Sequence, residues 1–162
     1  MSFVRTILGD VSPDSLGPTS AHDHLIRVGG GEVLVDGEDM DLSSVDLAIE
    51  EARFFVQAGG GTIVDMCPID MGRSIERLVQ VNAAVPELRV IVATGFHKGS
   101  LYAETTSHWI NRYTVRQIAE LIVADIEEGV DLHDYSGPIV ERAAARAGVI
   151  KEIGRASCRE RV

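Results

Sequence analysis

The chain has 162 residues, 45% apolar and 25% charged, which excludes a disordered polymer because such chains have too few apolar side chains to form a core. Its 25 acidic residues against 15 basic ones give a net charge of −10, so we expect no nucleic-acid partner, since phosphate binding requires a basic face. No apolar run of about 18 residues and no apolar signal region occur, so we expect a cytoplasmic protein that does not span a membrane.

The N-terminal third of the chain predicts two short β elements and a loop. Residues 3–16 alternate apolar and polar side chains around Gly9-Asp10, a turn dipeptide, which predicts a β-hairpin with its turn there. Residues 18–26 predict a short strand. Residues 29–42 are rich in Gly and Asp and predict a loop.

Helices and strands then alternate along the chain. Ser43 or Ser44 is expected to cap a helix that runs through Phe55 and ends at the glycines 59–61. The pattern then predicts a strand at 62–66, a helix at 73–85, a strand at 89–94, a helix at 115–128 and the start of a strand at 147–151.

This β-α-β-α-β-α-β order predicts an α/β fold with a parallel sheet covered by helices. Four βα units are half of an eight-stranded TIM barrel, which usually needs about 250 residues. We therefore expect the N-terminal half of a (β/α)8 barrel with a short N-terminal β-hairpin, in one partial domain over residues 1–151.

Residues 153–162 break the preceding pattern, because they lack apolar periodicity and carry three arginines. They match a common sequencing-library adapter translated in frame to a stop codon. We expect residues 152–162 to be a non-native, adapter-derived tail that includes Cys158 and part of the Glu152 codon, and the natural gene to continue past Lys151. The alternative is a natural basic tail.

Two histidines, His22 and His24, flank Asp23 at the end of the first barrel strand. Residues i and i+2 of a strand point to the same face, so both imidazoles aim at one place, which suits a divalent metal such as zinc. The alternative is a pair of hydrogen-bonded histidines in the barrel mouth. Active sites of such barrels lie where the strands end, which favours a functional role.

Lys151 ends the apolar strand Ala-Gly-Val-Ile-Lys, so its amine is expected to face the barrel mouth. An amine removed from water tends to lose its proton and become nucleophilic. It can then take up carbon dioxide and become a carbamate, an oxygen ligand for two metals. The alternative, favoured by the residues alone, is a lysine that extends to solvent.

Asp65 ends the strand at 62–66, and Cys67 follows two residues later. Asp65 is a candidate to hydrogen-bond a metal-ligating histidine, and a role as hydrogen-bond acceptor in the following turn is about equally expected. Free cysteines are usually small buried hydrophobes, so Cys67 is not expected to be a nucleophile.

The loop after the strand at 89–94 is expected to face the pocket. It carries His97, Lys98 and Tyr102, which are candidates for substrate contact, and Lys98 suits an anionic group. An ordinary surface loop is the alternative.

Together these segments resemble the phosphotriesterase family of the amidohydrolase superfamily, including its phosphotriesterase-like lactonases. The resemblance is carried by Gly-Pro-Thr-Ser-Ala-His-Asp-His-Leu, Thr-Ile-Val-Asp with the later Gly72-Arg73, Ala-Thr-Gly, and Ala-Gly-Val-Ile-Lys, which begin at residues 17, 62, 93 and 147. They occur in family order across residues 17–151. The family usually has Glu where this chain has Asp23.

The resemblance implies that His22 and His24 bind the more buried of two divalent metals and that Lys151 is the catalytic, carboxylated bridging ligand. The metals would be Zn²⁺, with Mn²⁺ or Co²⁺ as alternatives. Glu152 is the rival bridging ligand, because some relatives place a glutamate there. The family's remaining ligands, two histidines and an aspartate, lie on later strands.

The implied activity of the intact parent is hydrolysis of an ester or lactone by a metal-bridged hydroxide, with phosphotriester hydrolysis as the alternative. The loop with His97, Lys98 and Tyr102 looks more like the lactonase branches. The parent is expected to be a homodimer acting on a small molecule. A different hypothesis is that the chain is a truncated, non-catalytic half-barrel that aggregates or stays molten. A third is a binding module that dimerises two half-barrels.

Overall fold

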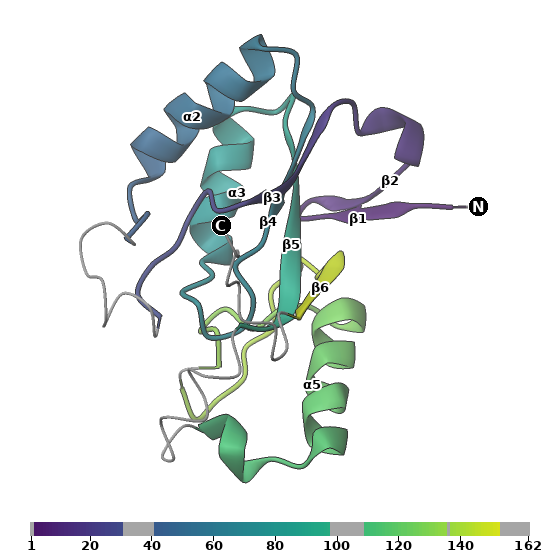
Figure 1. Ribbon diagram of the computed structural model, residues 1–162, viewed down its shortest axis with the longest axis vertical. Helices are drawn as coiled ribbons and strands as arrows, with labels where there is room; N and C mark the ends of the chain where they lie inside the picture. Colours follow the sequence, from purple (N-terminus) through teal and green to yellow (C-terminus); the bar gives the residue numbers. More distant parts are fainter. Residues whose placement is uncertain (1, 31–40, 98–108, 136, 153–162) are drawn as a thin grey trace, which may run out of the picture.

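The computed structural model describes residues 2–30, 41–97, 109–135 and 137–152 (Figure 1). Its centre is a parallel sheet in the order β3-β4-β5-β6. The strands are β3 (Thr19–Asp23), β4 (Thr62–Asp65), β5 (Arg89–Phe96) and β6 (Val149–Glu152). The helices α2 (Val45–Gln57), α3 (Ile75–Ala84) and α5 (Val115–Glu127) follow the first three strands in turn. The predicted α/β half-barrel is therefore confirmed.

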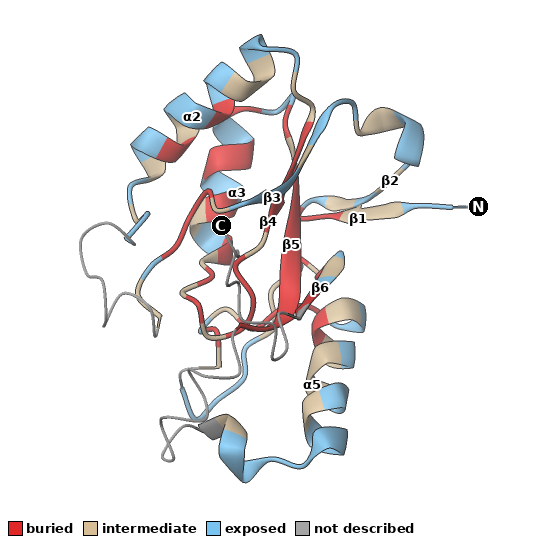
Figure 2. Cartoon of the chain, in the orientation of Figure 1, coloured by how far each residue is buried: buried red, intermediate tan, exposed pale blue. Residues whose placement is uncertain are grey.

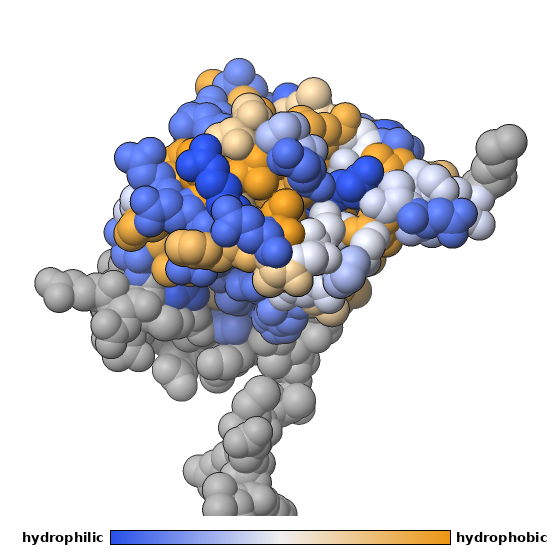
Figure 3. Space-filling view, turned by 90° about the horizontal axis from the view of Figure 1, so that it is seen from above, coloured by the Kyte–Doolittle hydropathy of each residue, from blue (hydrophilic) through white to orange (hydrophobic). Residues whose placement is uncertain are grey.

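A two-stranded antiparallel sheet of β1 (Val4–Thr6) and β2 (Gly9–Val11) precedes the half-barrel, and this hairpin extends from the body in Figure 3. The expected turn at Gly9-Asp10 is wrong, because Gly9 pairs with Thr6 and the turn lies at Ile7 and Leu8. The buried Ile7 donates its amide hydrogen to the carbonyl of Val90 at 2.8 Å. This contact with β5 places the turn earlier than local sequence indicates.

The helix ends follow local chemistry. Ser44 Oγ accepts a hydrogen bond from the amide of Leu47 at 3.3 Å and caps α2, which ends just before the glycines 59–61. Thr114 and Gln117 form a reciprocal capping box at the start of α5. Short 3₁₀ helices cover Pro13–Ser15 and Trp109–Arg112. No helix in the described segments is long and apolar enough to cross a membrane.

A tertiary contact moves one boundary in each of two predicted elements. The strand expected at 18–26 ends at Asp23, because the amides that follow it turn to the Asp65 carboxylate. The helix expected from residue 73 starts at Ile75, because Arg73 enters a buried ion pair.

The main core lies between the sheet and the helices α2 and α3 (Figure 2). Its members are apolar and almost entirely buried, and include Ile63, Leu78, Val81, Val90 and Val92. A smaller cluster packs α5 against Ile69 and Phe96. The strands β4 and β5 are buried along most of their length, which fixes the positions of the residues that follow them.

Candidate metal centre

The histidines predicted from their spacing lie side by side at the end of β3. His22 is in the strand and exposed, and His24 follows it and is partly buried. The ring centroids are 5.5 Å apart with planes at 71°. The Asp23 carboxylate accepts hydrogen bonds from the His24 amide at 2.9 Å and from Ser20 Oγ at 3.1 Å, which fixes the backbone between the two rings.

Lys151 lies on β6 and is buried, with 3% of its surface exposed. Its Nζ donates a hydrogen bond to the carbonyl of Met66 at 2.9 Å. The Met66 amide in turn donates to the carbonyl of Asp23 at 2.8 Å. The lysine amine and the histidine segment therefore meet at the backbone that follows β4, at one end of the sheet.

The position of Lys151 depends on Gly95, its partner in the β5–β6 register. Gly95 has a φ of +97°, and a Cβ built there would lie 2.1 Å from the Lys151 carbonyl oxygen. Only glycine combines this backbone conformation with so close an approach. The expected Ala-Thr-Gly segment thus contributes to the site by letting β6 pack directly on β5.

The surroundings of His24 hold its imidazole in the neutral form. Burial, and after it the positive charges of Lys151 and Arg27, lower its pKa from 6.5 to about 4. His24 is therefore neutral at neutral pH, the form of imidazole that binds metals.

Asp65 ends β4 and is buried, and burial raises its pKa. Its carboxylate accepts hydrogen bonds from the amides of Leu25 at 3.0 Å, Ile26 at 3.4 Å and Cys67 at 3.0 Å. These are contacts of the turn-acceptor kind, one of the two roles expected from the sequence. They join the segment after β3 to the segment after β4.

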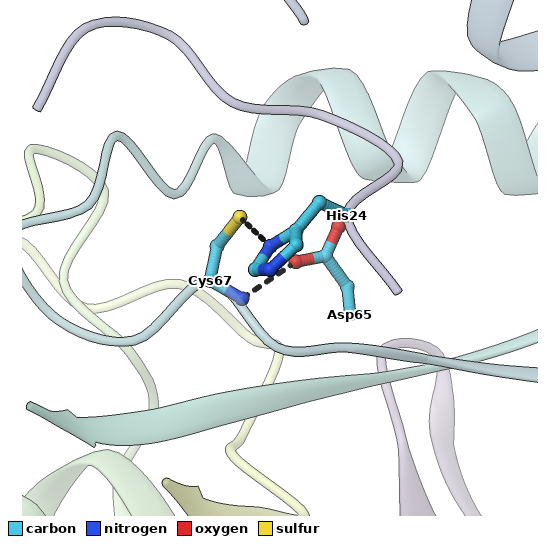
Figure 4. A group of neighbouring side chains, drawn as sticks. All are labelled: His24, Asp65 and Cys67. Carbon is cyan, nitrogen blue, oxygen red and sulfur yellow. Dashed lines mark hydrogen bonds between the residues drawn. The ribbon is translucent and has the colours of Figure 1, made fainter. Parts of the chain in front are cut away.

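Cys67 is fully buried, as expected, but it also contacts the proposed metal ligand (Figure 4). Its Sγ lies 3.1 Å from His24 Nδ1 and 3.4 Å from the carbonyl oxygen of Ile26. Burial and the nearby Asp65 carboxylate raise the pKa of this thiol, so it keeps its proton and is not a nucleophile. The i, i+2 spacing from Asp65 is the signal that could have placed Cys67 here.

His24, Asp65 and Cys67 also form a group whose ligand atoms all lie within 4.8 Å of one another. Two sets of residues are therefore candidates to hold a metal: this group, and the set of His22, His24 and Lys151. The chemistry of their donor atoms distinguishes them. The Asp65 oxygens already accept backbone amides, and the Cys67 thiol keeps its proton, whereas neutral imidazoles and a carbamate formed on lysine are donors that divalent metals take. The donors His22, His24 and Lys151 therefore fit a divalent metal better.

The expected substrate residues follow β5. His97 comes directly after Phe96 and is buried. Lys98 and Tyr102 lie outside the described residues, so their expected roles stay predictions.

A buried ion network holds the strand ends in place, and the sequence did not reveal it. Arg73 donates to the carbonyl of Ala93 at 2.8 Å and to the Asp125 carboxylate at 3.1 Å. Thr94 Oγ1 also donates to Asp125, at 2.8 Å. Asp125 thus connects α5 to β5 and to the segment before α3.

The family model for the phosphotriesterase family matches residues 2–158. The chain belongs to the phosphotriesterase family. It is 42% identical over 151 residues to a phospho-furanose lactonase of Mycoplasmopsis synoviae, an alignment that covers 92% of this chain and 42% of that protein.

Solved structures agree with this membership of the phosphotriesterase family. An amidohydrolase from Mycoplasma synoviae has a TM-score of 0.85 and 39% identity, over 91% of this chain and 42% of that one. A lactonase from Listeria monocytogenes has a TM-score of 0.77 and 25% identity, over 92% of this chain and 46% of that one. The chain thus spans less than half the length of these relatives.

Proposed function

We propose that this chain supplies the N-terminal half of the active site of a binuclear metal-dependent lactonase. One observation carries the proposal: His22, His24 and the buried Lys151 meet at the same end of the parallel sheet. Active sites of (β/α)8 barrels lie at that end. Family membership and the lactonase relatives support the same conclusion.

His22 and His24 would hold the more buried metal, and Lys151, as a carbamate, would supply an oxygen ligand shared with the second. Zinc is the proposed metal, since imidazole and oxygen donors suit it. When bound, the metals would activate water and polarise the carbonyl under attack. Burial keeps His24 neutral, and the hydrogen bonds of Asp65 hold the two strand ends that carry these ligands.

The proposed substrate is a lactone of a phosphorylated sugar, because the relative from Mycoplasmopsis synoviae is a phospho-furanose lactonase. Lys98 would pair with the phosphate, and His97 and Tyr102 would contact the sugar. The alternative is phosphotriester hydrolysis. Rates of hydrolysis distinguish the two when they are measured on a phosphorylated furanose lactone, its unphosphorylated form and an organophosphate triester.

The first experiment is on the gene. Sequencing the locus past the Lys151 codon tests the proposal that residues 152–162 are derived from an adapter, and it provides the reading frame to express. We expect the frame to continue and to supply two further histidines and an aspartate at strand ends. A genomic frame that ends as printed contradicts this.

The protein expressed from that frame is then assayed with His22→Ala and with His133→Ala as the matched control. His133 is exposed and hydrogen-bonded to Glu141 at 3.2 Å, outside the proposed ligand set. We expect His22→Ala to abolish measurable lactone hydrolysis and to lower zinc content, and His133→Ala to retain both. Lactone hydrolysis unchanged in His22→Ala, or no bound zinc or manganese in the parent, would disprove the proposal.

A further inference from the structure

We propose that Cys67 is a positioning residue that selects the metal-binding tautomer of His24. This inference rests on the proposed function in that His24 is taken as a metal ligand. Cys67 itself touches no metal in the proposal. Its sulfur acts on the imidazole nitrogen other than the one proposed to bind the metal.

The geometry defines a chain of two hydrogen bonds. The Cys67 thiol donates to the carbonyl of Ile26, with Sγ and O at 3.4 Å. His24 Nδ1 lies 3.1 Å from the sulfur, and the direction of this contact depends on the tautomer of the ring. In the proposed arrangement the ring nitrogen is the donor, because a thiol that donates to the Ile26 carbonyl has no second proton to give. The chain of hydrogen bonds, called the relay below, therefore runs from His24 through Cys67 to the backbone of residue 26. Figure 4 shows its first contact, between His24 and Cys67.

The consequence concerns the second ring nitrogen. In a neutral imidazole one nitrogen carries the proton and the other a free lone pair. A proton held on Nδ1 leaves Nε2 free to bind a metal, and the partner of the protonated nitrogen also fixes the ring orientation. Neutral histidine in water prefers the proton on Nε2, so the protein must supply a reason for the opposite tautomer.

The nearby carboxylate of Asp65 has other hydrogen-bond partners and is not assigned the task of holding the protonated nitrogen of His24. A carboxylate commonly holds the protonated nitrogen of a ligating histidine, but the Asp65 oxygens accept the amides of Leu25, Ile26 and Cys67. One of those bonds, from the Cys67 amide to Oδ1 at 3.0 Å, fixes the backbone that carries the thiol. Asp65 therefore positions Cys67, and Cys67 positions His24.

The test reads the tautomer without any metal. The 162-residue chain is labelled with ¹⁵N-histidine, and magic-angle-spinning NMR, which does not depend on particle size, reports which nitrogen of His24 is protonated. His24→Gln assigns the signal. We expect the proton on Nδ1 in the wild type and in Cys67→Ser, whose hydroxyl both donates and accepts, and a shift toward Nε2–H in Cys67→Ala.

Zinc affinity of the protein expressed from the full reading frame, measured by competition with a chelator, gives the second readout. Loss of a partner of this kind typically costs about 10- to 100-fold in metal affinity, which we expect for Cys67→Ala and not for Cys67→Ser. His133→Ala, at the exposed histidine outside the proposed ligand set, is the matched control and should change neither readout.

Three results would overturn the inference. The first is an Nε2–H tautomer in the wild type, a measurement that stands even if Cys67→Ala fails to fold. The second is a Cys67→Ala variant with unchanged tautomer and zinc affinity. The third is a sulfur-to-cobalt absorption band in the Co²⁺-loaded wild type that Cys67→Ala removes, because the thiol would then be a ligand. A wild type with the expected tautomer but no zinc binding would support the relay and count against the proposed function.

Discussion

Asp125 is the acceptor at the centre of the buried network of polar side chains. Its carboxylate is fully buried and accepts hydrogen bonds from Arg73, Thr94, Tyr135 Oη at 2.7 Å and Arg142 at 2.9 Å. The two arginines come from segments on either side of α5 in the sequence. A buried carboxylate is tolerated because these donors replace the water that it lost.

Asp125→Ala is expected to lower the free energy of unfolding by about 3–5 kcal/mol, because it leaves the buried Arg73 without its main countercharge. Urea denaturation of both proteins measures the difference. Asp14→Ala, at an exposed aspartate, is the control and should change it by less than about 0.5 kcal/mol. Equal effects of the two substitutions would show that the network does not stabilise the fold.

Asp134 gives a prediction about pH. Burial raises its pKa from 3.8 to about 6 although Arg73 lies 3.3 Å away. The folded state then holds this proton more tightly than the unfolded state, so the contribution of Asp134 to stability falls as pH rises from about 4 to about 6. Asparagine, the substitution that tests this, also tolerates the φ of 49° found at residue 134.

Asp134→Asn should therefore gain stability relative to the wild type across that pH interval and keep a constant difference above it. Chemical denaturation at several pH values between 4 and 7 measures this, with Asp14→Asn as the control. A difference between wild type and Asp134→Asn that does not vary with pH would contradict the assignment.

At the scale of elements, the β5–β6 pairing decides where Lys151 lies. Gly95→Ala would force a Cβ against the Lys151 carbonyl at 2.1 Å and strain a φ of +97°. The backbone strain alone costs about 1–3 kcal/mol. We expect lower stability and weaker zinc binding in the same variant, because β6 must move away and take its lysine along.

Gly137→Ala is the matched control, since a Cβ there meets its nearest neighbour only at 3.9 Å. Thermal unfolding and chelator competition compare the two alanine variants. Equal stability of the two would mean that β6 is not held against β5 as the structure has it.

At the scale of the molecule, the sheet is open on both sides in the described part of the chain. β3 and β6 each have one neighbouring strand in the sheet, and most of β3 is exposed (Figure 2). Beside β3 lies a groove of about 700 Å³ against α2, where Leu47 and Phe54 are 63% and 64% exposed. Unpaired strand edges next to apolar surface favour association with another chain.

The 162-residue chain by itself is therefore expected to self-associate and to show no lactone hydrolysis of its own. Size-exclusion chromatography over a range of concentrations, with light scattering, measures the association. Leu47→Lys together with Phe54→Lys should reduce it, and Val115→Lys, at another exposed apolar residue, is the control. A monomer that hydrolyses lactones would contradict this expectation.

Local patterns predicted most of the elements and the pair of histidines. Ser44 and the glycines 59–61 place α2, and the i, i+2 spacing places His22 beside His24. The prediction failed where a distant contact changed a local preference, as when Ile7 bonded to Val90 and moved the hairpin turn.

The sequence by itself determined the alternation of strands and helices, the half-barrel and the strand-end positions of the candidate ligands, because these depend on periodicity and on near neighbours. Only the tertiary structure decided that Cys67 reaches His24 across 43 residues of chain and that Asp125 joins two arginines. Such contacts depend on how β3, β4 and α5 pack, and packing is a property of the whole fold that no local pattern contains.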